Sequence, residues 1–122
     1  MQTNTGALNV GDFVVAQWGY EANIATSFMV TRRTKTSVEL MAVQNELVSY
    51  RGNGGGGESL TRPTITPATF CVWADTQHKK ADGTIRFMKK IKAYADGSEY
   101  VSFEYCNGYK WSGQLMNEYN YH

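Results

Sequence analysis

The chain has 122 residues, of which 42% are hydrophobic and 13% aromatic, and its 12 basic and 11 acidic side chains leave a net charge of +1. This length fits one domain, and the apolar content is enough for a core and argues against disorder. The near-neutral charge excludes nucleic-acid binding as a default function, and apolar runs of at most four or five residues are too short for a membrane-spanning helix.

The sequence pattern divides the chain into a polar arm and a domain rich in short strands. Residues 1–9 are small and polar, which predicts a flexible N-terminal arm ahead of a single domain at residues 10–122. Apolar and β-branched residues, alternating in the second segment, predict strands at 13–18, 24–33 and 37–43. The third strand can continue beyond Gln44-Asn45 across a bulge.

Glycine dominates the middle of the chain. Arg51-Gly-Asn-Gly-Gly-Gly-Gly-Glu58 has few side chains to pack, so residues 51–67 are predicted to form a flexible loop. These glycines do not indicate a phosphate-binding loop, because no Lys-Ser/Thr pair follows them.

Turn signals separate further strands in the second half. Strands are expected at 68–75, 85–94 and 100–106. The turn dipeptides around them are Asp82-Gly83, Asp96-Gly97 and Asn107-Gly108. A tail rich in aromatic residues begins at Tyr109.

Six short strands without a convincing helical stripe indicate an all-β domain. We expect a small twisted SH3-like barrel of five to six antiparallel strands with a Gly-rich loop. A barrel is favoured over a sandwich at this size because closure removes exposed strand edges.

Cys71 and Cys106 lie in apolar, strand-like contexts, which predicts two buried free thiols rather than a disulfide. Together with His78 and His122 they lack the close paired spacing of a zinc site, so no metal is expected.

Several short motifs resemble those of a known group of proteins. Gly11-Asp12, then Trp18-Gly19-Tyr20-Glu21 and Asn23, are similar to the opening of a family of short uncharacterised proteins from phages, prophages and plasmids. The tail with Trp111-Ser-Gly113 and residues 117–122 resembles the aromatic end of that family. Ala22 and Ser112 depart from its usual residues. The resemblance implies a phage or mobile-element origin and no particular activity.

Enzyme motifs are nearly absent. Asp12 and Glu21 are expected near one end of the first strand pair, where two carboxylates could do acid–base work. Asp12 also suits a turn cap, and Glu21 can accept backbone hydrogen bonds. We predict that the chain is not an enzyme and has no cofactor, with capture of a small ligand or nucleotide, or a minor hydrolase activity, as a remaining alternative.

Aromatic residues crowd the C-terminal tail in a Gly- and Asn-rich context, which is the composition of a protein-binding surface. The predicted surface comprises Trp18, Tyr20, Glu21, Tyr109, Trp111, Tyr119 and Tyr121. The alternative is that the tail folds back and covers one end of a barrel.

Basic residues gather just before the tail. They are Lys79, Lys80, Arg86, Lys89, Lys90 and Lys92. With aromatic neighbours they are typical of a platform for single-stranded nucleic acid. The competing interpretation is a solvated strand with protective lysines at a sheet edge.

These features predict a cytoplasmic phage or mobile-element accessory protein that binds a host or defence protein, for example as an inhibitor. The Met1-Gln-Thr-Asn-Thr start has no basic region and apolar segment of a signal peptide, which is the basis for the expected location. A nucleic-acid-binding barrel is the alternative, and a homodimer remains compatible with an exposed aromatic patch.

Overall fold

The computed structural model describes residues 6–18, 22–53, 56–69, 71, 78–104 and 106–121. The described residues form an all-β fold, as predicted. Its strands are β1 (Phe13–Trp18), β2 (Ala22–Arg33), β3 (Ser37–Asn53), β4 (Gly56–Pro67), β5 (Arg86–Lys90), β6 (Lys92–Ala93), β7 (Glu99–Ser102), β8 (Asn107–Lys110) and β9 (Met116–Tyr121).

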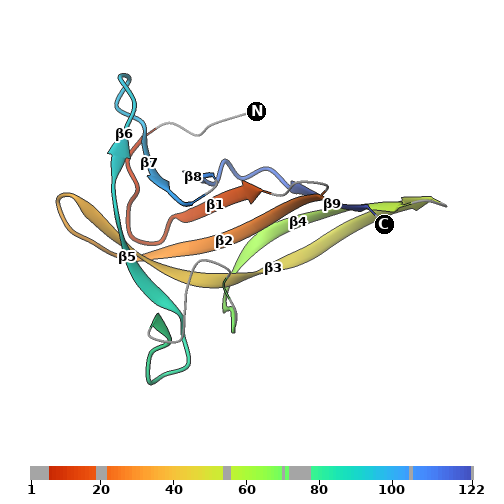
Figure 1. Cartoon of the computed structure of the whole chain (residues 1–122), viewed down its shortest axis with the longest axis horizontal. Coiled ribbons are helices and arrows are strands. Elements are labelled where there is room, and N and C mark those ends of the chain that lie inside the picture. Colours follow the sequence, from red (N-terminus) through yellow and green to blue (C-terminus); the bar gives the residue numbers. More distant parts are fainter. Residues whose placement is uncertain are drawn as a thin grey trace.

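The nine strands belong to one sheet, in the order β5-β3-β4-β9-β2-β1-β8-β7-β6, and every pair is antiparallel. The expected five or six strands therefore become nine, and the sheet is not closed into the expected SH3-like barrel. Figure 1 shows why: β3 and β4 extend as a long hairpin toward one end, while β5 runs steeply across the other. The strands at the two ends of the order, β5 and β6, do not pair with each other.

The sheet forks beside β2. Along the edge away from β1, β2 pairs with β3 from Ser27 to Arg33 and with β9 at Ala22 and Asn23. Between these two pairings, side chains satisfy the backbone. The Asn45 side chain donates to Ala25 O at 2.9 Å, and Ala25 N donates to Glu118 Oε1 at 2.9 Å. The fork is thus held by polar groups rather than by a continuous ladder.

The predicted bulge in the third strand is confirmed. The pairing register with β4 shifts between Val43 and Asn45, and β3 continues to Asn53. Residues 51–67, predicted to be a flexible loop, instead contain β4 at Gly56–Pro67. The glycines have no side chains to pack. The segment is held by backbone pairing instead, because β4 pairs with β3 along one edge and with β9 along the other.

Part of the predicted N-terminal arm is docked on the domain. Leu8 is fully buried, its N donates to Glu99 Oε1 at 2.9 Å, and its carbonyl accepts from Arg33 Nη1 at 2.7 Å. A single apolar side chain among polar neighbours is too weak a sequence pattern to predict this contact. Residues 1–5 lie outside the described residues.

Two of the three predicted turns are confirmed. Gly83 and Gly97 both have φ of 88°, a conformation that suits glycine. The expected bend at Asn107-Gly108 is wrong, because both residues lie in β8. The turn falls earlier, where Phe103 N donates to Cys106 O at 2.7 Å.

Gly108 serves close packing instead of a turn. A Cβ at this buried position would lie 2.7 Å from Phe103 Cε2 and 2.8 Å from Val14 Cγ1. The expected strand at 85–94 is divided into β5 and β6, and the strand at 100–106 ends as β7 at Ser102. The strand expected at 68–75 falls mostly outside the described residues.

The main core lies on the inner face of the curved sheet. Val14, Phe28, Val30, Leu40 and Val101 are fully buried there. Residues two positions apart share a face of a strand, so Val15 and its neighbours in register lie on the outer face. A smaller cluster of Val15, Ala25 and Met116 lies there, with Trp111 against it.

Candidate functional site

The outer face carries a row of aromatic rings across β1, β8, β7 and the turn before β7. Tyr109 lies opposite Val15 on one side and opposite Tyr100 on the other. We define the outer aromatic stripe by its residues: Phe13, Tyr94, Tyr100, Tyr109 and Trp111.

Ring contacts join the members of the outer aromatic stripe in two groups, one of three tyrosines and one of Phe13 with Trp111. The ring centroids of Tyr94 and Tyr100 are 4.4 Å apart and stacked, and those of Tyr100 and Tyr109 are 6.0 Å apart. Phe13 and Trp111 meet edge to face at 5.9 Å. Stacking fixes the rings in a common arrangement, which lowers the conformational entropy that a partner would have to remove on binding.

Hydroxyl groups cross-link the tyrosines. Tyr94 OH and Tyr109 OH are 2.9 Å apart, and the Asn107 side chain donates to Tyr109 OH at 3.2 Å. The hydrogen bond with Tyr109, with a smaller contribution from burial, raises the pKa of Tyr94 to about 12. Tyr94 is still 43% exposed, so its ring and hydroxyl are accessible to a partner.

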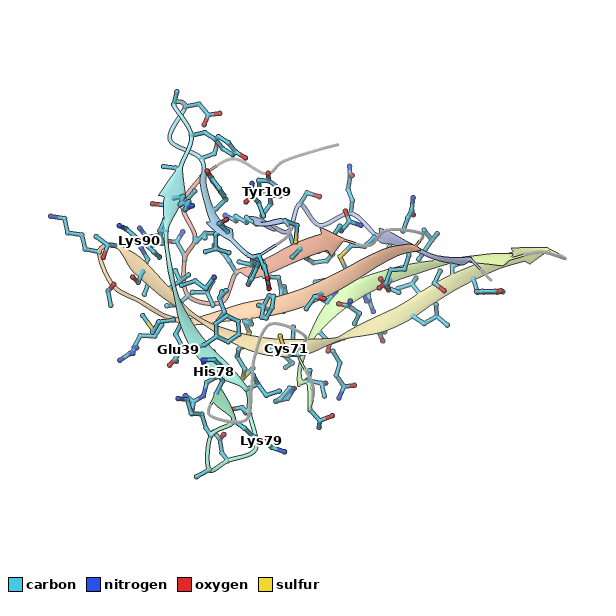
Figure 2. All side chains as sticks on the ribbon, in the orientation of Figure 1. Glu39, Cys71, His78, Lys79, Lys90 and Tyr109 are labelled. Carbon is cyan, nitrogen blue, oxygen red and sulfur yellow. The ribbon has the colours of Figure 1, made fainter. Side chains whose placement is uncertain are left out.

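Trp111 also has a structural role on the outer face. Its Nε1 donates to Gln114 O at 2.7 Å, and its ring packs on the smaller cluster with Val15 and Met116. Tyr109 (labelled in Figure 2) lies opposite Val15 in register, and its ring contacts Tyr94 and Tyr100. Substituting Trp111 therefore perturbs folding more than substituting a tyrosine.

The structure brings together Tyr109 and Trp111 of the surface predicted from sequence. Tyr20 and Glu21 lie outside the described residues. The backbones of Trp18, Tyr119 and Tyr121 are described but their side chains are not. β9 is separated from β8 by β2 and β1, so the tail does not run as one continuous segment of surface.

Sequence reasoning missed Phe13, Tyr94 and Tyr100 as members of the stripe. The Asp96-Gly97 turn contained a signal for the last two, because a hairpin there places Tyr94 diagonally across from Tyr100, whose direct partner is Lys92. Phe13 belongs to the stripe because β1 pairs with β8, and these two strands are far apart in sequence.

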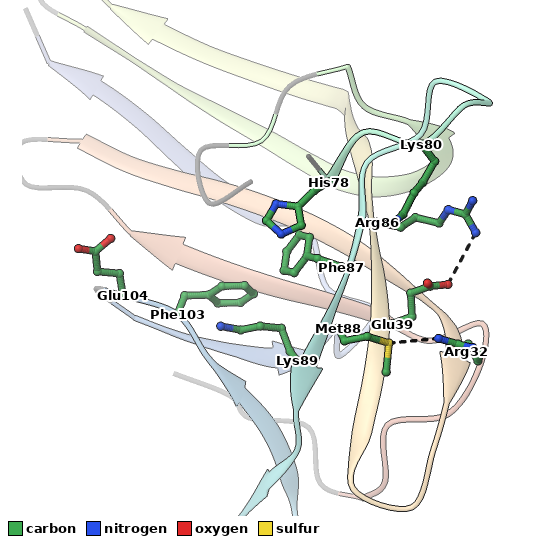
Figure 3. Close-up of a pocket in the computed structure, with 10 residues that line it drawn as sticks. All are labelled: Arg32, Glu39, His78, Lys80, Arg86, Phe87, Met88, Lys89, Phe103 and Glu104. Carbon is green, nitrogen blue, oxygen red and sulfur yellow. Dashed lines mark hydrogen bonds and ion pairs between the residues drawn. The ribbon is translucent and has the colours of Figure 1, made fainter. Parts of the chain in front are cut away.

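The predicted basic residues do not form one face. In β5, Arg86 and Lys90 alternate with Lys89, so they project to opposite faces of the sheet. Lys79 is bridged to Ile85, and Lys92 pairs with Tyr100. A groove of about 560 Å³ gathers Lys80, Arg86 and Lys89 with other residues around β5 (Figure 3).

Of the two carboxylates considered for acid–base work, Glu21 lies outside the described residues. Asp12 accepts from Asn9 N at 2.8 Å and lies 3.5 Å from Lys110 Nζ, which matches the capping role foreseen for it. The described His, Cys, Asp and Glu side chains form no group of three that could hold a metal ion. Cys71 is buried and Cys106 half-buried, both as thiols, and burial raises the pKa of Cys106.

Comparison with protein-family models, with curated proteins and with solved structures finds no match for this chain. Among the described residues there is no helix whose length and apolar character would let it cross a membrane.

Proposed function

We propose that the chain is a non-enzymatic accessory protein of a phage or mobile element. It binds a host or defence protein through the outer aromatic stripe and acts as an inhibitor in the host cytoplasm. The observation that carries the proposal is the stacked and hydrogen-bonded set of tyrosines on the sheet surface, at Tyr94, Tyr100 and Tyr109.

The chemistry of the outer aromatic stripe supports protein binding. Tyr and Trp supply large contact areas with few rotatable bonds, and they are enriched where interfaces derive most of their affinity. Asn107 and the hydroxyls of Tyr94 and Tyr109 add polar groups at fixed positions, which would set the orientation of a partner. The phage or mobile-element setting rests on the Trp18-Gly19-Tyr20-Glu21 resemblance.

The test compares partners captured from nuclease-treated host lysate by the wild-type chain and by a Tyr94→Ala/Tyr109→Ala variant. We expect one dominant host protein with the wild type and loss of at least about tenfold in its affinity with the variant, as for an interface hot spot. Trp111 is left in place because it also packs on the smaller cluster. Mass spectrometry identifies the partner, and titration of the purified partner gives the affinity.

The matched control is Ile65→Ala, which removes a 73% exposed side chain from β4, outside the outer aromatic stripe. This variant should bind like the wild type. Equal capture by the tyrosine variant and the wild type, with both folded by circular dichroism, would contradict the proposal.

A further inference from the structure

The strand β5 has an open backbone edge. The odd-numbered residues that flank β5 form backbone hydrogen bonds toward β3. Ala42 N donates to Ile85 O at 2.9 Å, and Ile91 N donates to Thr36 O at 2.8 Å. Hydrogen-bonding direction alternates along an antiparallel strand, so the even-numbered residues direct their N–H and C=O groups away from β3. At Arg86 this side is already taken by the bridge between Lys79 and Ile85, where Lys80 N donates to Thr84 O at 2.7 Å, which leaves Met88 and Lys90. Within the described part of the chain, β3 is the strand that pairs with β5, and these outward groups lie at the end of the sheet.

The groove around β5 follows this edge and is lined from both faces. Met88 and Arg86 project to the outer face, whereas Phe87 and Lys89 project to the inner face, where Lys89 Nζ lies 5.0 Å from the Phe103 ring centre. Figure 3 shows these side chains on the two sides of the β5 ribbon. An extended chain lying along the edge places alternate side chains on these two faces, whereas a compact ligand would reach one face only.

The groove favours negative charge. Arg32, Lys80, Arg86 and Lys89 line it, against the carboxylates of Glu39 and Glu104. Glu39 is already engaged, since it accepts from Thr31 Oγ1 at 2.9 Å and lies 3.7 Å from Arg86 Nη1. The side chains next to the open edge are therefore predominantly cationic.

We propose that the open edge of β5 binds an extended acidic peptide segment of a protein partner, which adds to the sheet as a further strand. Backbone bonds to Met88 and Lys90 supply the affinity, and Arg32 and Lys89 select acidic side chains. This surface is separate from the outer aromatic stripe: Figure 2 places Tyr109 on the opposite side of the molecule from His78 in the groove.

A second copy of the chain is a poorer occupant of this edge. Pairing β5 with β5 would set Arg86, Lys89 and Lys90 against the same residues of the other copy. Like charges opposite each other across strands are destabilising. The same lysines that discourage self-pairing would attract an acidic segment, and this attraction makes the binding specific.

The test uses the full chain labelled with ¹⁵N and a short peptide of alternating glutamate and threonine, capped at both ends. We expect the peptide to slow amide hydrogen exchange at Met88 and Lys90 by roughly tenfold. Phe87 and Lys89 should change little, because their amides already bond to β3. A peptide of alternating lysine and threonine should have no effect.

Two substitutions at one position separate edge pairing from charge attraction. Met88→Pro removes an outward N–H that β3 does not use, and proline is tolerated on edge strands in that orientation. It should keep the fold, as judged by the remainder of the amide spectrum, and lose the peptide. Met88→Leu keeps the N–H and should bind like the wild type.

Arg32→Gln with Lys89→Gln should weaken binding and reduce its dependence on salt.

Four results would overturn the proposal. The first is an unchanged exchange pattern at millimolar peptide and low salt. The second is protection without the alternation between Met88 and its neighbours. The third is peptide binding that survives in a folded Met88→Pro variant. The fourth is protection of the edge by single-stranded oligothymidylate, or by raised protein concentration alone, in place of the acidic peptide.

Discussion

The hydroxyl pair of Tyr94 and Tyr109 joins the rings of the outer aromatic stripe, and it can be tested by titration. Tyr94 keeps its proton to a pKa of about 12 chiefly because of its hydrogen bond with Tyr109. In Tyr109→Phe the acceptor is absent, so the pKa of Tyr94 should fall toward the ordinary tyrosine value near 10. Ultraviolet absorbance of tyrosinate against pH measures this, with Tyr50→Phe as the control for an exposed tyrosine on β3. A tyrosine titration curve that is the same in wild type and Tyr109→Phe, apart from the lost group, would contradict the assignment.

Packing between strands, rather than backbone freedom, explains the glycine in β8. A Cβ at Gly108 would come within 3.0 Å of Val101 Cγ2, and closer still to Phe103 and Val14. Gly108→Ala should therefore lower the free energy of unfolding by about 1–3 kcal/mol, the usual cost of overpacking a core. Denaturant titration measures the loss, and Gly113→Asn is the control, since Gly113 has open space around it and φ of 93°, which asparagine tolerates. A Gly108→Ala variant as stable as the wild type would contradict close packing as the reason for this glycine.

An ion pair links three distant parts of the whole molecule and gives it a defined acid sensitivity. Arg33 Nη2 donates to Glu99 Oε2 at 3.0 Å, and Glu99 also accepts from Leu8 N, so strand β2, strand β7 and the N-terminal segment meet at one carboxylate. The hydrogen bond from Arg33, aided by Leu8 and opposed by burial, lowers the pKa of Glu99. A lowered pKa in the folded state contributes stability above the unfolded value near 4.3, and that stability is lost as the pH falls through the folded pKa. Glu99→Gln should cost about 1–3 kcal/mol of unfolding free energy at pH 7, as for a hydrogen bond to a charged group.

The control for this prediction is built into the pH series. The difference in unfolding free energy between wild type and Glu99→Gln should shrink as the pH falls from the unfolded value near 4.3 through the lowered folded pKa, because the carboxylate of Glu99 is progressively protonated. Thermal or urea unfolding from pH 7 to pH 3 measures it. A difference that is constant across this range would show that the carboxylate charge is not what holds the segment.

The sequence by itself determined the fold class, most strand positions and two of three turns. The β-branched and aromatic residues of 13–18, the period of two in 24–33 and the Asp-Gly turns are local signals that need no partner strand. Local signals also singled out Tyr109 and Trp111, which the structure brings into one stripe with rings that the tail alone did not reveal. The tertiary structure decided the features that depend on pairing between distant residues. These are β4 in the glycine segment, the burial of Leu8, the strand position of Gly108 and the open edge of β5. Each is set by which strand lies alongside, because backbone hydrogen bonds and close packing are supplied by residues far away in the chain.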